Sequence, residues 1–174
     1  GETLGAGFLH KEKGEDFLDR ATDHYALVYV IRGKGRYCES NGKTHQLEEG
    51  MIFQRFPGVT HSNYIDSEQD WLEGFIALGN HIYQALKTMG VIDFSTVVYT
   101  PRVTDEQRMD IIKKFYQLAL AVTEIDEKNI LRFLAEELET LQNILQANHS
   151  SDIFDTYFSL VKNSPELRYS LRDF

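Results

Sequence analysis

The sequence lacks the signatures of several protein classes. Its single cysteine, Cys38, excludes an internal disulfide framework and favours a reducing, cytoplasmic location. There is no apolar run of membrane-spanning length, and no charged segment followed by an apolar one at the start. We therefore expect a cytoplasmic protein without a membrane partner.

Clustered basic residues are also absent. Acidic residues number 27 and basic residues 18, which gives a net charge of −9, and no basic run exceeds one or two residues. A surface that neutralises phosphates needs clustered lysine and arginine. The chain by itself is therefore not expected to bind nucleic acid.

The first hundred residues have the pattern of a β domain. Of the 174 residues, 42% are hydrophobic, which is enough to bury the core of one domain with appendages. Turn signals separate short apolar or alternating runs, and Asn41-Gly42 suits a tight hairpin because both residues tolerate positive φ. Strands at this spacing without intervening helices predict an antiparallel sandwich or barrel. The predicted strands are "FLDR", "HYALVYVI", "GRYCES", "KTHQL", "GMIFQRF", "SNYI", "DWLEGFIAL" and "STVVYT".

The pattern becomes helical after Pro101. A short helix, "NHIYQALKTM", is expected before the last strand and ends at Gly90. Thr104 and Gln107 form a capping box at the start of the next helix. Another helix is expected from about residue 126 to 147.

A third helical stretch, "DIFDTYFSLVKN", follows, and near the end of the sequence Ser170 is a candidate helix cap, with Asp173 three positions on. The sequence begins with Gly1 rather than methionine and stops where a new helix would start. We therefore expect it to be a piece of a longer protein, with Gly1 left from a removed tag.

Leucines alternate at spacings of three and four in the helix expected at 126–147, a heptad-like stripe. One interpretation is that this stripe covers an open face of the barrel. The other, which we favour, is that two chains pair through it, because leucine at every position exceeds what one small barrel face requires. The residues of this leucine stripe are Leu131, Leu134, Leu138, Leu141 and Leu145.

Three segments in order, "YALVYVIRGKGRY", "LEEGMIFQRFPGVTH" and "WLEGFIAL", resemble the N-terminal ligand-binding domain of AraC-type transcriptional regulators. "FLDR" also resembles the segment that carries a sugar-contacting arginine in the arabinose-responsive member, and "YSLRDF" resembles the start of the family's first DNA-binding helix. Two local departures from the family pattern are Met51, in place of an acidic residue, and Phe56-Pro57, in place of two prolines.

The resemblance implies a mainly β fold with added α structure. Residues 1–100 would form a cupin-like antiparallel β-barrel (jelly roll) with an N-terminal arm, for which "GETLGAGFLHKEKG" is suitable because it is flexible at the outset. Residues 101–165 would form a helical dimerisation segment. Residues 166–174 would be a linker and the start of a helix-turn-helix domain, through which alone the protein would contact DNA.

Cupin enzymes hold a metal with a His-x-His pair, a glutamate a few residues later and a further histidine after a Pro-x-Gly-like turn. Here His45 has no histidine two residues away, although Glu48 follows, and only His61 stands after the turn. One imidazole does not make a metal site. We expect no metal and no cofactor.

Strand alternation predicts a ligand pocket instead. In "DWLEGFIAL", Trp71, Glu73, Phe75 and Ala77 share one face, and the other face is apolar and suits packing against helices. Aromatic rings with a carboxylate suit a small polar ligand. Each of these residues also has a plain structural interpretation: the rings as core aromatics and Glu73 as a solvated group at the barrel mouth.

His61 and Asn63 share a face of another strand, and Asn63 can both donate and accept. His61 is expected at the pocket rim or in the structural turn, with a neutral ring that satisfies backbone groups. Arg20 offers a five-donor fork, or it forms a surface salt bridge with a neighbouring aspartate. By resemblance, Arg20, Asn63, Glu73 and Phe75 fall at or near sugar-contacting positions, with Tyr64 as the alternative to Asn63 if the register shifts by one.

These expectations combine into an effector-sensing, homodimeric domain of an AraC-type regulator that binds a small carbohydrate-like ligand in the barrel. Ligand binding would order the arm or shift the barrel against the helices. The alternative is a metal-free cupin enzyme acting on a sugar or small acid, with Glu73 and His61 as an acid/base pair. A third possibility is a dimerisation module whose barrel is filled with side chains.

Overall fold

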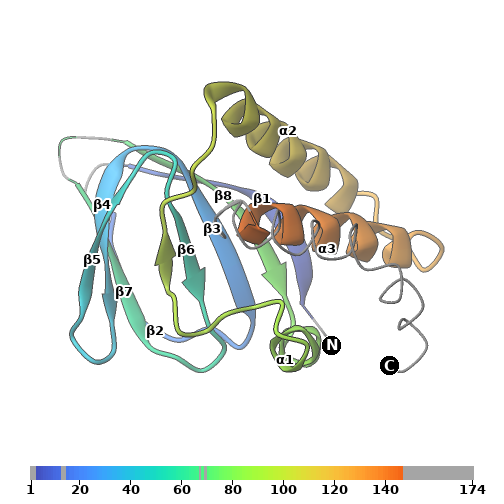
Figure 1. Cartoon of the computed structure of the whole chain (residues 1–174), viewed down its shortest axis with the longest axis horizontal. Helices are drawn as coiled ribbons and strands as arrows, with labels where there is room; N and C mark the ends of the chain where they lie inside the picture. Colours follow the sequence, from blue (N-terminus) through green and yellow to red (C-terminus); the bar gives the residue numbers. More distant parts are fainter. Residues whose placement is uncertain (1–2, 13–14, 67, 69, 147–174) are drawn as a thin grey trace, which may run out of the picture.

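The computed structural model describes residues 3–12, 15–66, 68 and 70–146, which form strands and helices that pack closely together (Figure 1). The helices are α1 (Asn80–Thr88), α2 (Asp105–Val122) and α3 (Ile130–Gln146). The strands are β1 (Leu4–Lys11), β2 (Phe17–Arg20), β3 (Tyr25–Arg32), β4 (Lys34–Glu39), β5 (Thr44–Glu48), β6 (Ile52–Arg55), β7 (His61–Ile65), β8 (Trp71–Leu78) and β9 (Val98–Tyr99).

The strands form two antiparallel sheets. One sheet has the order β1-β8-β3-β6-β9 and the other β2-β7-β4-β5. Consecutive strands alternate between the sheets in several places, as in a jelly roll, and the inner faces enclose a shared interior. This confirms the predicted fold class, a cupin-like antiparallel barrel with helices added to it.

Side-chain alternation decides which residues enter the barrel. On β8, Trp71 and Phe75 join a cluster inside the barrel, whereas Ile76 and Leu78 join a cluster on the outer face of the same sheet. Strand β3 is buried over its first six residues, as its unbroken apolar run predicted, because both of its faces are covered.

The hairpin predicted at Asn41-Gly42 joins β4 to β5. Gly42 has a φ of 87°, which a residue with a side chain adopts only with strain, and its amide donates to the carbonyl of Glu39 at 2.9 Å. Asn41 accepts from the amide of Lys43 at 2.8 Å through its side chain. The turn is therefore fixed by the two residues that the sequence singled out.

The helices α2 and α3 lie against the outer face of the five-stranded sheet, and α1 lies at one end of the barrel (Figure 1). The predicted capping box is present: Thr104 accepts from the amide of Gln107, whose side chain accepts from the amide of Thr104. The fully buried ring of Phe115 lies directly over Gly74 of β8, where an added Cβ would meet it at 3.0 Å. A small residue at this point lets α2 approach the sheet closely.

The structure corrects two expectations. The segment expected as a flexible arm contains β1, which pairs with β8 from Leu4–Leu78 to Lys11–Trp71. The helix expected from about residue 126 begins at Ile130, because Asp126 caps a preceding turn by accepting from the amides of Lys128 and Asn129. The third helical stretch and the tail at 166–174 lie outside the described residues.

Candidate functional site

The inner faces of the two sheets bring polar side chains together in the barrel. Strand β8 contributes Glu73, and β7 contributes His61 and Asn63. Strands β6 and β1 add Arg55 and Lys11, neither of which was predicted from the sequence. His61, Asn63, Glu73 and Lys11 are all more than nine-tenths buried.

Glu73 is held by two inward-facing donors. The indole Nε1 of Trp71 donates to its Oε2 at 2.5 Å, and Arg55 Nη2 lies 3.3 Å from its Oε1. The carboxylate has no exposed surface, so it does not lie solvated at a barrel mouth. The contact between the buried carboxyl group and the guanidinium of Arg55 fixes the position of both side chains.

Three cationic side chains surround the ring of Phe17, which is half-buried. The charged groups of Lys11, Arg20 and Arg55 lie 5.6, 5.8 and 5.4 Å from the ring centroid. Arg20 is exposed on β2, at the edge of this group, rather than inside the barrel. Burial lowers the pKa of Lys11, the nearby guanidinium of Arg55 acts in the same direction, and Glu73 opposes both.

His61 lies between two aromatic rings. Its ring centroid is 5.5 Å from that of Phe17 and 5.3 Å from that of Tyr37, and both pairs are stacked. Its Nδ1 lies 3.3 Å from the carbonyl oxygen of Val59, and burial lowers its pKa to about 4. The ring is therefore neutral at physiological pH, and an Nδ1–H donated to Val59 leaves Nε2 as an acceptor. This agrees with the expected neutral ring, but the ring lies inside the barrel rather than at its rim.

Several buried polar atoms of this group have no hydrogen-bond partner among the described residues. Native structures contain few such atoms, because an unpaired buried polar group costs about 1–3 kcal/mol. Their concentration inside one barrel is the mark of a site that a polar ligand or water completes. They are Lys11 Nζ, Arg55 Nε, His61 Nε2 and both Asn63 Nδ2 and Oδ1.

Tyr64 points away from this group. Its ring lies 4.6 Å from the guanidinium carbon of Arg36, and both residues line a cleft of about 790 Å³ that includes polar residues of β4 and β5. Asn63 is fully buried and Tyr64 only partly, so the register places Asn63 in the interior.

A second pocket, of about 310 Å³, lies between α1 and the barrel. Its lining includes Tyr37, which stacks on His61, and Val59, whose carbonyl faces the same imidazole. Two residues that contact His61 therefore also line this pocket.

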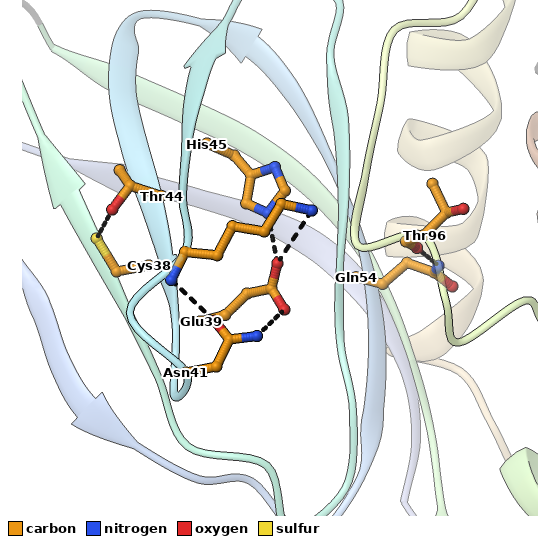
Figure 2. A network of polar contacts seen from close by, with 8 residues as sticks. Cys38, Glu39, Asn41, Thr44, His45, Gln54 and Thr96 are labelled. Atoms are coloured by element: carbon orange, nitrogen blue, oxygen red, sulfur yellow. Dashed lines mark hydrogen bonds and ion pairs between the residues drawn. The ribbon is translucent and has the colours of Figure 1, made fainter.

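His45 belongs to a separate polar network at the β4–β5 hairpin (Figure 2). Its Nε2 lies 2.6 Å from Oε1 of Glu39, which is also 3.9 Å from the Lys43 ammonium. Asn41 donates to the other oxygen of Glu39 at 3.4 Å. In the part of the chain that the structure describes, no three His, Cys, Asp or Glu residues are grouped so as to hold a metal ion.

The leucine stripe is divided by its burial. Leu141 and Leu145 are buried in the cluster between the helices and the sheet, and Leu134 and Leu138 pack partly against it. Leu131 is 78% exposed. Four of the five leucines thus contribute to covering the barrel, as the first interpretation of the stripe proposed, and pairing between chains is not tested by this arrangement.

A small antiparallel barrel with an incompletely paired polar interior is a small-molecule-binding module. The sequence comparisons agree with this class. The model of the AraC-like ligand binding domain family matches residues 7–138, and the chain belongs to this family. No helix among the described residues is long and apolar enough to cross a membrane.

Several solved structures of diverse origin are similar in fold, and the chain spans 66% or less of the three that follow. The cupin domain of Schizosaccharomyces pombe Cnp3 has 15% identity and a TM-score of 0.42 over 53% of this chain and 66% of that one. YhaK from Escherichia coli has 19% identity and a TM-score of 0.39 over 45% and 37%. A salicylate 1,2-dioxygenase from Pseudaminobacter salicylatoxidans has 24% identity and a TM-score of 0.40 over 49% and 23%. A search of curated proteins gives no match.

Proposed function

We propose that the chain is the effector-sensing domain of a cytoplasmic AraC-type transcription regulator, and that it binds a small carbohydrate-like ligand inside the barrel. The observation that carries this proposal is the set of buried polar atoms without partners around His61 and Asn63. Membership of the AraC-like ligand binding domain family supports the regulatory part. Contact with DNA would be made by another domain of the regulator.

The chemistry of the interior suits a hydroxylated ligand. Asn63 offers a donor and an acceptor, and His61 offers an acceptor at Nε2, so adjacent hydroxyl groups can both donate and accept. The rings of Phe17 and Tyr37, which stack on either side of His61, supply apolar surface for the C–H groups of a sugar. Trp71 and Phe75 add further aromatic surface in the same interior.

The helical layer is proposed as the dimer interface. On α2, Met109, Tyr116 and Leu120 follow at spacings of seven and four and are 52%, 57% and 54% exposed. On α3, Ile130 and Leu131 are 42% and 78% exposed. Large apolar side chains that recur on exposed helix faces favour coverage by a second copy of the chain.

Strand β1 connects the two regions. Its last residue, Lys11, is buried beside Phe17 in the barrel interior, and its earlier residues lie beneath α2. A ligand that contacts the Lys11 end of β1 would therefore act on a strand that also supports the helices. Such a ligand shifts the balance between two arrangements only by binding one of them more tightly.

The enzyme alternative has less support from the geometry. An acid/base pair needs one group whose proton is exchanged near neutral pH. Glu73 is instead engaged by Trp71 and Arg55, and the lowered pKa of His61, about 4, makes it a weak base. These features suit binding better than proton transfer.

A thermal-shift screen of the chain against neutral sugars and sugar acids tests the proposal. A ligand at a hundred times its dissociation constant should add about 2.7 kcal/mol to the free energy of unfolding. The shift should disappear in Asn63→Leu and persist in Gln46→Leu, which changes an exposed side chain of β5. Equal shifts in both variants would place the ligand elsewhere, and no shift with any compound would favour a barrel without a ligand.

A further inference from the structure

We propose that the effector is an anion, a small hydroxycarboxylate such as a sugar acid, whose carboxylate is bound by Lys11 and Arg55 inside the barrel. This inference rests on the proposed function and adds the charge of the ligand to it. Three features of the barrel interior support an anionic ligand: its balance of charges, the positions of its unpaired atoms and the contacts that its cations share with Phe17.

The interior is cationic although the chain is acidic. The whole sequence has a net charge of −9, yet the buried group contains the cations Lys11 and Arg55 and a single carboxylate, Glu73. Arg20 adds a third cation at the exposed edge of the group. Among the inward-facing groups, the Glu73 carboxylate neutralises one of the two cations, so the interior itself keeps one positive charge that can attract an anion.

Two further carboxylates act on Lys11 from the segment before β2, but both are engaged by backbone amides. Glu15 accepts from the amide of Glu12 at 2.7 Å, and Asp16 accepts from the amide of Ile65 at 2.9 Å. Both residues are exposed. They lower the local positive potential without giving the Lys11 ammonium a hydrogen-bond acceptor.

The unpaired atoms divide into donors and acceptors in a way that fits a hydroxycarboxylate. Lys11 Nζ, Arg55 Nε and Asn63 Nδ2 are buried donors, and His61 Nε2 and Asn63 Oδ1 are buried acceptors when His61 is neutral. A carboxylate accepts several charge-assisted hydrogen bonds at once, and hydroxyl groups donate to the two acceptors. A neutral ligand would give Lys11 Nζ no charged hydrogen-bond acceptor.

Lys11 and Arg55 both lie beside the ring of Phe17. The charged groups of Lys11 and Arg55 lie within 5.6 Å of the same ring centroid, and the imidazole of His61 stacks on that ring at 5.5 Å. Lys11 comes from the edge strand of one sheet and Phe17 from the edge strand of the other. A carboxylate bound between them would join the two sheets at this edge.

The test compares ligands that share the same ring and ring hydroxyl groups but carry a carboxylate, a hydroxymethyl group or a methyl ester at the same carbon. Glucuronate is measured against glucose and methyl glucuronate, and galacturonate against galactose and methyl galacturonate, by thermal shift and calorimetry with the full 174-residue chain. The expected result is binding of an acid at least tenfold tighter than binding of its neutral partners. The acid should also lose about ten- to a hundredfold in affinity in Lys11→Met, which removes one charge-assisted hydrogen bond.

Two variants separate a charge effect from a change in the fold. Lys11→Arg keeps the charge and should recover at least part of the affinity, and Lys43→Met removes a lysine that is 66% exposed at the β4–β5 hairpin and should leave affinity unchanged. The proposal is overturned if neutral sugars bind as tightly as their acids, or if Lys11→Met binds the acid as wild type does. In both cases the sensing function itself would stand. No binding of any sugar or acid at millimolar concentration would overturn both proposals.

Discussion

Two buried amides on opposite faces of the barrel wall differ completely in their hydrogen bonding. Gln54 points outward from β6, and its Nε2 donates to the carbonyl of Thr96 at 2.7 Å, one of three acceptors (Figure 2). Its Oε1 accepts from the hydroxyl of Tyr25 at 2.6 Å. Asn63 points inward from β7 and has no partner for either atom among the described residues. Both side chains are 0% exposed.

The difference between the two amides distinguishes a group that stabilises the fold from a group that remains available for the proposed ligand. The outward amide ties β6 to the segment that leads into β9, and its polar groups are satisfied within the chain. The inward amide keeps its hydrogen-bonding capacity free, at a cost in stability that ligand binding would recover. The outward face of the barrel wall thus holds an amide that stabilises the fold, and the inward face holds one that the proposed ligand would pair.

Gln54→Leu should have the largest effect on stability. The substitution removes the acceptor of the buried Tyr25 hydroxyl and a donor to the carbonyl of Thr96. An unsatisfied buried group costs about 1–3 kcal/mol, so a loss of roughly 2 kcal/mol or more in the free energy of unfolding is expected in urea denaturation. A loss below about 1 kcal/mol would show that water replaces the amide and that the contrast with Asn63 is weaker than the geometry indicates.

Glu137 lies on the helical side of the barrel wall but, unlike Gln54, it is buried without paired oxygens. Its carboxyl group makes the free energy of unfolding depend on pH. This α3 carboxyl is fully buried, and neither oxygen makes a hydrogen bond of good geometry within the described residues. Burial raises its pKa from 4.5 to about 9, and the nearby Gly5 amide acts in the opposite direction. Between these pH values the unfolded chain has Glu137 ionised, whereas the folded chain keeps it protonated. Its contribution to stability is complete below pH 4.5 and falls as the pH rises towards 9.

Glu137→Gln should therefore flatten the pH dependence. One proton corresponds to about 1.4 kcal/mol per pH unit, which is the largest slope that the wild type can lose. Urea denaturation at several pH values measures the difference between variant and wild type. Glu139→Gln, an exposed neighbour on α3, is the control and should keep the wild-type slope. Equal slopes in all three proteins would mean that Glu137 is ionised in the folded chain.

The fold was predictable because its signals are local. The apolar run of β3, the alternation on β8 and the capping box of Thr104 and Gln107 each depend on residues close together in the sequence. Strand β1 was not predicted, because "LGAGFLHK" contains two glycines and no regular alternation. It is a strand because its backbone pairs with β8, more than sixty residues later.

The site was predictable only in part for the same reason. His61, Asn63 and Glu73 follow from strand alternation, and Arg55 could have been found likewise, because it shares a face with Phe53 in "IFQR". Lys11 could not, since its burial depends on the pairing of β1 with β8. The order of strands in a sheet and the contacts between sheets arise from long-range packing, which no local pattern encodes.

Asn63→Leu tests whether the inward-facing amide, unlike that of Gln54, contributes nothing to the stability of the fold. Replacing an unpaired buried amide with an apolar side chain of similar size removes a desolvation penalty and breaks no hydrogen bond within the described chain. The free energy of unfolding in urea should stay within about 1 kcal/mol of wild type or rise, in contrast to the loss for Gln54→Leu. A loss comparable to that of Gln54→Leu would mean that ordered water already satisfies Asn63 and that the amide is structural.

Leu131→Asp should have the smallest effect on the fold and a clear effect on assembly. Leu131 is 78% exposed, so an exposed substitution there should change the free energy of unfolding of the monomer by no more than about 0.5 kcal/mol. If α3 pairs with a second copy, a buried aspartate at the interface should shift the dimer towards monomer in light scattering across a dilution series. Leu138→Asp serves as the contrasting variant. Leu138 packs partly against the core, so its substitution should lower both the free energy of unfolding and the stability of the dimer. A wild-type chain that is monomeric at high micromolar concentration, or an unchanged dimer in Leu131→Asp, would leave the stripe as a cover for the barrel.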